Sequence, residues 1–386
     1  MPGDEIDRAI ADEQLHVLVL ERALLPAKRH LTVAEVAAES GVADEVILRF
    51  RRALGLPDVA PDEPAFTEFD VEALQGTTTL MRLSLASLDS ALQLARVIGS
   101  SMARIAEAEV ENSPVLHGEL TSIEAAELYI MTAEYTLPAT ARILEYAWRR
   151  HMQEAMRRAA MLARASLRDP VLLAIGFADM VGFTALSQQL SEEALAEVVD
   201  RFEGLAYDIV ARCGGRVIKM IGDEVMFTAV EPKVAAQIAL TLAEAYADDE
   251  MLSDVRVGLA YGPVLLRDGD VYGPVVNLAH RSVNIAAEGS VLTSEEFHRA
   301  LEADQDFEWR SMRARYLKGI GRVSLWVLRR PGAPTTAASR RDERRARWMV
   351  KEAVRQTAER SGRRHGREAD GAVEPAGGAA GAPPGC

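Results

Sequence analysis

Residues 217–227, VIKMIGDEVMF, constrain the fold of this chain more than any other stretch. Two short apolar runs flank a Gly-Asp step, and this pattern predicts two antiparallel strands joined by a two-residue turn. On regular strand geometry Val217 and Lys219 point to one face and Ile218 to the other. Burial of an unpaired charge is costly. Lys219 and Asp223 therefore need partners, which are either other side chains or something that the protein binds.

The composition narrows the classes of function. The chain has 386 residues, of which 48% are hydrophobic, so a sizeable core and two or three domains are expected. Aromatic residues make up only 5%, which argues against stacking platforms for single-stranded nucleic acid. The formal net charge of -14 gives no overall attraction to phosphate backbones, although a local basic patch could still bind them. We expect no nucleic-acid partner.

The cysteines and the N-terminus indicate the compartment. Cys213 and Cys386 form neither a disulfide framework nor a metal-ligand spacing, which fits a reducing cytosol. The acidic N-terminus, MPGDEIDRAI, lacks the basic start and the apolar block of a signal peptide. No apolar run reaches the roughly 18 residues that a membrane-spanning helix needs. These features predict a cytoplasmic protein without a membrane span.

Composition divides the chain into four regions. Residues 1–150 have helical patterns, with 13 Lys and Arg against 25 Asp and Glu, a net charge of -12. Residues 151–168 form a basic amphipathic linker helix before an Asp-Pro step. Residues 169–330 alternate strand-like and helix-like stretches, which predicts an α/β or α+β domain. The Pro- and Gly-rich end of 331–386 predicts a largely disordered tail, with a docking element as the alternative.

Residues 31–55 have the spacing of a helix-turn-helix. Thr32 and Glu35 form a capping box that opens the first helix, and Gly41 ends it. DNA binding would use the arginines of the second helix. The alternative is a helical hairpin that serves only for packing, and we favour it because the region is acidic.

Two acidic residues stand at predicted strand ends. Asp179 ends the apolar run VLLAIGFADM with Gly182 close behind it, and Asp223 lies in the turn of the hairpin. A carboxylate in such a place suits a hard cation such as Mg²⁺, although each aspartate alone could simply form a turn. If the run pairs with the hairpin, the two carboxylates converge. Paired carboxylates that hold two metal ions are typical of phosphoryl and nucleotidyl transfer.

Polar residues recur further along the chain. GDVYGPVVNLAHR, residues 269–281, contains Asp270, followed by Asn277 and Arg281 four residues apart. That spacing puts the amide and the guanidinium on one helix face, where they suit a ribose and a phosphate. Lys318 precedes two glycines in the loop YLKGIG. The alternatives are a surface Asn, a solvated Arg and a simple turn lysine.

Residues of about 170–330 resemble the catalytic domain of class III nucleotidyl cyclases, the adenylyl and guanylyl cyclase homology domain. The matching stretches are FADMVGFT, KMIGDEVMF, GDVYGPVVNLAHR and LKGIG, in family order and at family-like spacing. Residues 1–150 are similar, less specifically, to the helical regulatory half of some actinobacterial adenylyl cyclases. The resemblance implies an α+β protein, with an all-α N-terminal domain followed by a ferredoxin-like, palm-type α/β catalytic domain over 169–330.

The resemblance implies the metal and base contacts. Asp179 and Asp223 are similar to the two aspartates that bind two Mg²⁺ or Mn²⁺ ions per active site. Lys219 and Asp270 resemble the pair that recognises adenine, because a lysine donor and a carboxylate acceptor suit its hydrogen-bonding edge. Guanylyl cyclases usually carry a glutamate and a small polar residue in these two places. The implied substrate is therefore ATP.

The resemblance also implies the ribose and phosphate contacts. Asn277 is similar to the residue that orients the ribose, and Arg281 to the arginine that stabilises charge on the phosphates. Lys318 resembles a further triphosphate ligand, and Arg256 in DVRVG is a weaker candidate for that role. The implied reaction is attack of the ribose 3′-hydroxyl on the α-phosphate with loss of pyrophosphate. The chain is thus expected to be an adenylate cyclase, a phosphorus-oxygen lyase that makes 3′,5′-cyclic AMP by two-metal catalysis.

Family enzymes are dimers in which one chain supplies the metal aspartates and the other supplies the remaining groups. This chain carries both sets, so the resemblance implies a homodimer with two equivalent sites. His280 occupies a position where a small residue is frequent, and we interpret it as a helix-surface histidine. Three alternatives stay open: a guanylyl or mixed-specificity cyclase, a catalytically silent nucleotide-binding signalling module, and a transcriptional regulator.

The resemblance finally implies regulation by the N-terminal domain, which in some relatives responds to pH. The basic linker helix could pack on the acidic domain and set the orientation of the two catalytic halves. Four histidines are candidate proton sensors, and each is alternatively an ordinary surface or core histidine: His16, His30, His117 and His151.

Overall fold

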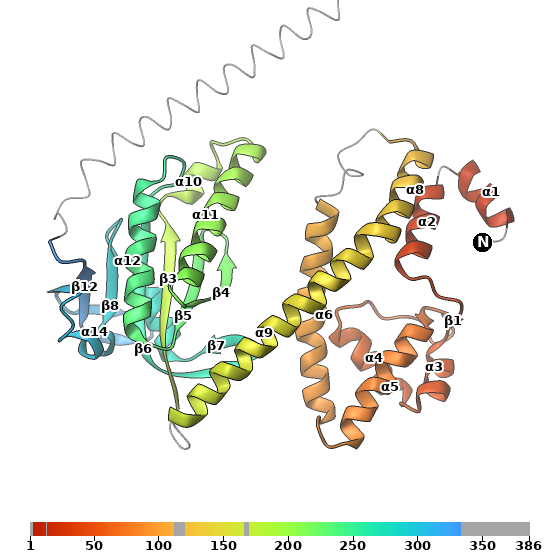
Figure 1. The fold of residues 1–386 in the computed structure, drawn as a ribbon, viewed down its shortest axis with the longest axis horizontal. Coiled ribbons are helices and arrows are strands. Elements are labelled where there is room, and N and C mark those ends of the chain that lie inside the picture. The colour runs from red at the N-terminus through yellow and green to blue at the C-terminus, as the bar shows by residue number, and fades with distance from the viewer. Residues whose placement is uncertain (1–2, 13, 112–119, 166–169, 333–386) are drawn as a thin grey trace, which may run out of the picture. The chain divides into compact units, whose positions relative to one another are not determined.

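The computed structural model describes residues 3–12, 14–111, 120–165 and 170–332 (Figure 1). The chain divides into two compact units, Met1–Leu167 and Arg168–Cys386. All but the first two residues of the tail predicted at 331–386 lie outside the described residues, as does His117. Among the described helices, none has the length and apolar character that crossing a membrane requires.

The first unit is helical, as predicted. Its helices are α1 (Gly3–Ala11), α2 (Leu15–Leu24), α3 (Val33–Ser40), α4 (Asp44–Ala53), α5 (Glu68–Arg82), α6 (Leu88–Glu111), α8 (Ser122–Met131), the π-helical turn η1 (Thr132–Thr136) and α9 (Leu137–Ala165). The two-residue strands β1 (His30–Leu31) and β2 (Phe66–Thr67) pair in antiparallel orientation.

The segment with helix-turn-helix spacing forms α3 and α4. The Thr32 capping box is present, and Gly41 ends α3 in the left-handed conformation at φ 72°. Two of the arginines of α4 that DNA binding would need make contacts inside the unit. Arg51 Nε donates to the Pro57 carbonyl at 2.8 Å, and Arg52 forms an ion pair of 3.0 Å with Asp58. These contacts favour the packing interpretation.

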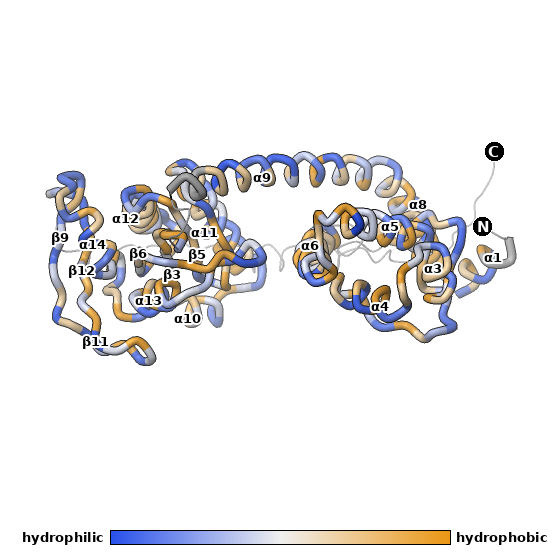
Figure 2. The backbone as a smooth tube through the Cα atoms, turned by 90° about the horizontal axis from the view of Figure 1, so that it is seen from below, coloured by the Kyte–Doolittle hydropathy of each residue, from blue (hydrophilic) through white to orange (hydrophobic). Residues whose placement is uncertain are grey.

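Helix α9 contains most of the predicted linker helix, but it begins at Leu137 and not near residue 151. It alternates polar and apolar residues along its length (Figure 2). In its described side chains, those of residues 137–160, none is buried. Exposed local ion pairs lie along it, such as Arg149–Glu145 at 2.6 Å. We expected this basic helix to pack on the acidic domain, but no side chain of residues 137–160 is buried in such a contact.

The second unit is a sheet with helices on both faces, which confirms the predicted α+β class. The strands run in the order β4-β5-β3-β6-β8-β12-β9, with β7 paired to β6 at its end. They are β3 (Val171–Met180), β4 (Arg216–Ile221), β5 (Glu224–Ala229), β6 (Val255–Arg267), β7 (Asp270–Tyr272), β8 (Val291–Ser294), β9 (Glu308–Ser311) and β12 (Leu325–Arg329). A separate hairpin joins β10 (Arg315–Leu317) to β11 (Gly321–Val323). The helices are α10 (Phe183–Ser187), α11 (Glu192–Arg212), α12 (Pro232–Asp248), α13 (Pro274–Val283) and α14 (Glu295–Leu301).

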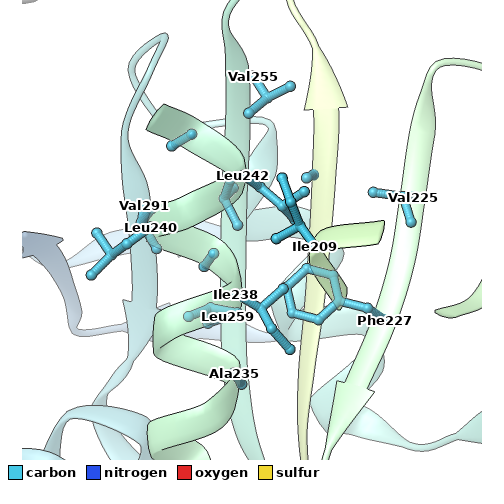
Figure 3. Close-up of a cluster of buried hydrophobic side chains, with 14 of the residues drawn as sticks. Ile209, Val225, Phe227, Ala235, Ile238, Leu240, Leu242, Val255, Leu259 and Val291 are labelled. Carbon is cyan, nitrogen blue, oxygen red and sulfur yellow. The ribbon is translucent and has the colours of Figure 1, made fainter. Parts of the chain in front are cut away.

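The larger core lies between the sheet and helices α11, α12 and α14 (Figure 3). Phe227 on β5 is fully buried there beside Ile209 and Ile238. Gly176 on β3 makes room for it, because a Cβ at this position would come within 2.1 Å of the Phe227 ring. Burial of each such side chain contributes roughly 1.5–3 kcal/mol.

The opposite face of the sheet carries α13 and a smaller core. Alternate residues of β3, among them Ile175 and Phe177, contact Ala279 and Val283 of α13. Gly258 on β6 allows the helix to lie close to the sheet. A Cβ on Gly258 would stand 2.2 Å from the Ala279 carbonyl oxygen. This close approach fixes how α13 sits on the strands.

The predicted hairpin forms as β4 and β5, but the predicted alternation in β4 is wrong. Val217 pairs with Phe227 and Lys219 pairs with Met226, so a β-bulge lies between Val217 and Lys219. Val217 packs against the larger core, whereas Ile218 packs on the α13 face. Lys219, opposite Met226, faces the α13 side as well. A bulge redirects side chains in this way because two residues oppose one.

We predict that Gly258→Ala destabilises the second unit, because the new methyl group meets the backbone of α13. Overpacking of this kind costs about 1–3 kcal/mol. Urea unfolding of the full chain, followed by circular dichroism, measures the loss. Gly204→Ala is the matched control, since nothing lies within 4 Å of its Cβ position. Equal stability of the two variants would contradict the prediction.

Candidate active site

The two predicted metal aspartates converge where neighbouring strands of the sheet end. Asp179 is the penultimate residue of β3, and Asp223 lies in the β4–β5 turn after Gly222, whose φ of 62° suits glycine. The Met180 amide donates to the Asp223 carbonyl at 3.0 Å, which ties the turn to the end of β3. The sequence predicted this convergence only on the condition that β3 pairs with the hairpin, and β3 does pair with β5.

Strand register places a row of charges beside Asp179. Glu224 of β5 is its partner on one side, and Arg256 of β6 is its partner on the other. The Arg256 guanidinium lies 3.3 Å from a Glu288 carboxylate oxygen. Its Nε is buried and has no hydrogen-bond partner in the described part of the chain. A bound ligand or water can satisfy such a donor.

The carboxylates in this row are destabilised as anions. Burial raises the pKa of Asp179 to about 6, and the charge of Asp223 adds to the rise while Arg256 opposes it. Burial likewise raises the pKa of Glu224 to about 7, with contributions from Asp179 and Asp223. Three acidic groups with little solvent around them are stabilised by a cation.

The donor set fits a divalent cation that also binds the substrate. Among the described residues no three His, Cys, Asp or Glu side chains gather closely enough to hold a metal ion by themselves. Mg²⁺ is commonly held by one or two carboxylates together with substrate phosphates and water. Asp179 and Asp223 provide the two carboxylates. Their negative charges lie close together, and this attracts a cation.

The predicted adenine pair also comes together. Lys219 Nζ lies 2.5 Å from Asp270 Oδ2, so the bulge in β4 aims the lysine at β7. The other oxygen of Asp270 accepts a hydrogen bond of 2.7 Å from the Val271 amide. Arg216 donates to the Gly269 carbonyl at 2.7 Å and holds the same loop. Asp270 is therefore fixed, and Lys219 is the partner that can turn towards a ligand.

Asn277 and Arg281 both lie on α13, which begins after Gly273 with Pro274 in its first turn. Asn277 is exposed and Arg281 is half-buried. Neither side chain has a hydrogen bond or an ion pair with any other described residue. Lys318 stands exposed in the β10–β11 turn and has no such contact with the described residues. Within one chain the structure does not join these three residues to the aspartates.

Glu224 was not predicted from the sequence, although an acidic residue next to Asp223 in a core hairpin was a visible signal. His280 was interpreted as a plain surface residue. The His280 side chain is 51% exposed, but its Nε2 lies 3.5 Å from Glu224 Oε2. Its ring meets Phe177 edge-on, with the ring centroids 5.3 Å apart. Of the candidate proton sensors, His30 and His151 are exposed and His16 is half-buried.

Comparison with known proteins accounts for both units. Residues 169–330 match the adenylate and guanylate cyclase catalytic domain family, and residues 1–156 match the adenylate cyclase regulatory domain family. An adenylate cyclase of Streptomyces coelicolor is 34% identical over 357 residues, which cover 85% of this chain and 93% of that protein. A Streptomyces griseus adenylate cyclase is 36% identical, over 78% of this chain and 76% of the relative.

Two further similarities complete the comparison. A pH-sensitive adenylate cyclase of Mycobacterium tuberculosis is 31% identical over 336 residues, which cover 82% of this chain and 84% of that protein. Among solved structures, an adenylate cyclase of Trypanosoma brucei aligns with a TM-score of 0.40 at 20% identity. That alignment covers 44% of this chain and 95% of the solved one.

We predict that Glu224 makes the metal-free protein less stable as the pH rises. Its folded-state pKa is about 7 against an ordinary value of 4.5. Below the ordinary value the carboxyl is protonated in both states, and between the two values the unfolded chain loses the proton first. The free energy of unfolding therefore falls by on the order of 2 kcal/mol as the pH rises between the two pKa values. Thermal unfolding in EDTA from pH 4.5 to 7.5 measures this loss.

Glu224→Gln removes the titrating group, so its melting temperature is expected to fall less over the same pH range. The exposed Glu302→Gln is the matched control and keeps the wild-type profile. Parallel profiles for all three proteins would show that Glu224 carries no such penalty.

Proposed function

The chain belongs to the class III adenylate cyclases that carry an N-terminal regulatory domain, and we propose that it converts ATP to 3′,5′-cyclic AMP and pyrophosphate in a regulated homodimer. The observation that carries this proposal is the convergence of Asp179 and Asp223 in a partly buried, acidic setting. The contact between Lys219 and Asp270 supports ATP as the substrate.

Asp179 and Asp223 would hold two Mg²⁺ or Mn²⁺ ions through their carboxylate oxygens. Such ions lower the pKa of the ribose 3′-hydroxyl and neutralise charge on the phosphates. Arg256, beside Asp179, is placed to bind a phosphate oxygen through its guanidinium. The Asp179 carboxylate is anionic when a cation offsets the burial that raises its pKa.

Lys219 and Asp270 would read the adenine edge. The lysine donates to a ring nitrogen that accepts, and the carboxylate accepts from the exocyclic amine. Asp270 keeps its orientation during this exchange, because the Val271 amide holds one of its oxygens. Guanine presents a carbonyl where adenine has its amine, so Asp270 would face an acceptor and remain unpaired.

Asn277 and Arg281 would act on the sugar and the phosphates from one face of α13. The amide orients the ribose so that its 3′-hydroxyl lies in line with the α-phosphate. The guanidinium stabilises the charge that develops as pyrophosphate leaves, and Lys318 adds a further positive charge. Their lack of partners among the described residues leaves these groups free for a ligand.

The site we propose is composite. One protomer supplies Asp179 and Asp223, and its partner supplies the adenine pair and the α13 residues. Both sets occur in this chain, which supports two equivalent sites in a homodimer. The β6–β7 ribbon exposes apolar side chains that a second copy would cover, namely Leu265 (60%), Leu266 (45%) and Tyr272 (48%).

Regulation by the first unit is the finer part of the proposal. The match of residues 1–156 to the regulatory domain family supports it. Helix α9 ends at Ala165 and β3, the strand that carries Asp179, begins at Val171, so only a short stretch of sequence separates them. The described histidines of the first unit do not single out one proton sensor.

The central test assays the purified full chain with ATP or GTP and with Mg²⁺ or Mn²⁺. We expect cyclic AMP from ATP, and we expect Asp223→Ala to lower kcat by on the order of 100-fold or more. Asp200→Asn on the exposed face of α11 is the matched control and should leave kcat unchanged. Cyclic GMP as the main product would favour a guanylyl cyclase instead.

A second test addresses the composite site. Asp223→Ala and Arg281→Ala chains are each expected to be inactive. Mixed in equal amounts and allowed to exchange subunits, they should recover about a quarter of wild-type activity. Half of the dimers are then mixed, and each mixed dimer has one intact site. A mixture with as little activity as its components, despite proven exchange, would rule out sites shared between protomers.

A further inference from the structure

Glu224 and His280 make a contact that the proposed chemistry does not use. His280 Nε2 lies 3.5 Å from Glu224 Oε2, and the glutamate side chain is only 10% exposed. No other side chain of the described residues forms a hydrogen bond or ion pair with Glu224. A buried carboxylate with one hydrogen-bonding or ion-pairing side chain beside it depends on that side chain for its orientation.

The contact joins the two functional parts of one chain. Glu224 follows Asp223 directly, and its strand partner is Asp179. His280 precedes Arg281 on α13, three residues after Asn277. The pair therefore links the hairpin that would hold the cations to the helix that would hold the ribose and the phosphates.

Helix α13 packs its apolar face on the sheet, and two contacts of neighbouring residues bear on its position. Ala279 meets Gly258 closely on the buried side of the helix. His280, the next residue, packs its ring edge-on against Phe177 of β3 and reaches Glu224 of β5. The first contact sets the distance of the helix from the sheet. The second adds a polar restraint on the rotation of the helix to the one from its buried face, which includes Val283. This rotation decides where Asn277 and Arg281 point.

We propose that the Glu224–His280 contact is a positioning link that couples the two active sites of the dimer. This inference rests on the composite site proposed above, in which the aspartates of one protomer serve one site and its α13 serves the other. A cation held by Asp179 and Asp223 fixes the start of β5 against β3. Glu224 passes that restraint to His280, and α13 becomes ordered for the second site. Coupling of this kind is reciprocal, so a nucleotide held by α13 tightens cation binding at the hairpin.

Hydrogen exchange of the full chain without nucleotide tests the link directly, in EDTA and in a titration with Mn²⁺ to high concentration, because two carboxylates without substrate phosphates bind a cation weakly. Mn²⁺ is expected to slow exchange in the hairpin, residues 216–229, and in α13 by about fivefold or more. In His280→Gln and in Glu224→Gln the hairpin should keep its protection, whereas α13 should lose the Mn²⁺-dependent part. Glu296→Gln, an exposed change on α14, is the matched control and should behave as wild type.

Two outcomes overturn the inference in different ways. If α13 gains the same Mn²⁺-dependent protection in both variants as in wild type, the link carries no coupling and the proposed function stands. If Mn²⁺ protects neither the hairpin nor α13 in the wild type, the cation site itself is wrong and the coupling fails with it. His280→Gln alters a half-exposed side chain, so a folding defect is not expected to obscure the result.

Mixed dimers provide a second readout that a general loss of stability would not produce. In a dimer of Asp223→Ala and Arg281→Ala chains, the intact site takes its α13 from the Asp223→Ala chain. The hairpin of that chain lacks a metal aspartate, so this dimer tests whether the Glu224–His280 contact itself positions α13, apart from the cation. His280→Gln in that chain should lower kcat by about fivefold with little change in KM for ATP. The same substitution in the Arg281→Ala chain should have little effect on kcat. Equal effects in both chains would overturn the positioning role.

Discussion

The antiparallel packing of β3 between β5 and β6 is the constraint on which the site depends. It sets Glu224, Asp179 and Arg256 side by side on the face that carries α13. The same strand alternates, so its other face builds the larger core with α11 and α12. One strand thus anchors the fold and carries the charge. A shift of its register by one residue would bury Asp179 in the apolar core and expose the residues now packed there.

Local sequence could predict the elements of this arrangement, and pairing determined the rest. The Gly-Asp turn between apolar runs predicted the hairpin, and the strand-end positions of Asp179 and Asp223 predicted that they would converge if the strands pair. The bulge at Val217 and Lys219 was not predictable, because a residue without a partner leaves no mark in the apolar pattern. Regular alternation put Lys219 with Val217, whereas the bulge aims it at Asp270. Glu224 was missed because its environment depends on register, which a single sequence does not show.

The acidic row is an unfavourable arrangement for a protein without a cation. Burial and mutual repulsion raise the pKa values of Asp179 and Glu224, so folding places carboxyl groups where their ionised forms are least stable. Arg256 offsets part of this charge, and its Nε still lacks a partner among the described residues. The excess negative charge at the site therefore attracts cations. This cost to the folded state is what a cation-binding site in a partly buried sheet edge requires.

A site divided between protomers also explains why Glu224 and His280 lie where they do. Within one chain the aspartates and α13 never act on the same substrate under the composite proposal, so their contact joins the metal side of one site to the sugar and phosphate side of the other. The Glu224–His280 contact can therefore make the structure of one site depend on whether the other site is occupied. Helix α13 has a close, rigid contact at Gly258 and a polar, adjustable one at Glu224. The first kind of contact holds a helix in place, and the second lets a charge change at the hairpin alter its restraint. An apolar pair at these two positions would hold the helix equally well but would respond to no change in charge.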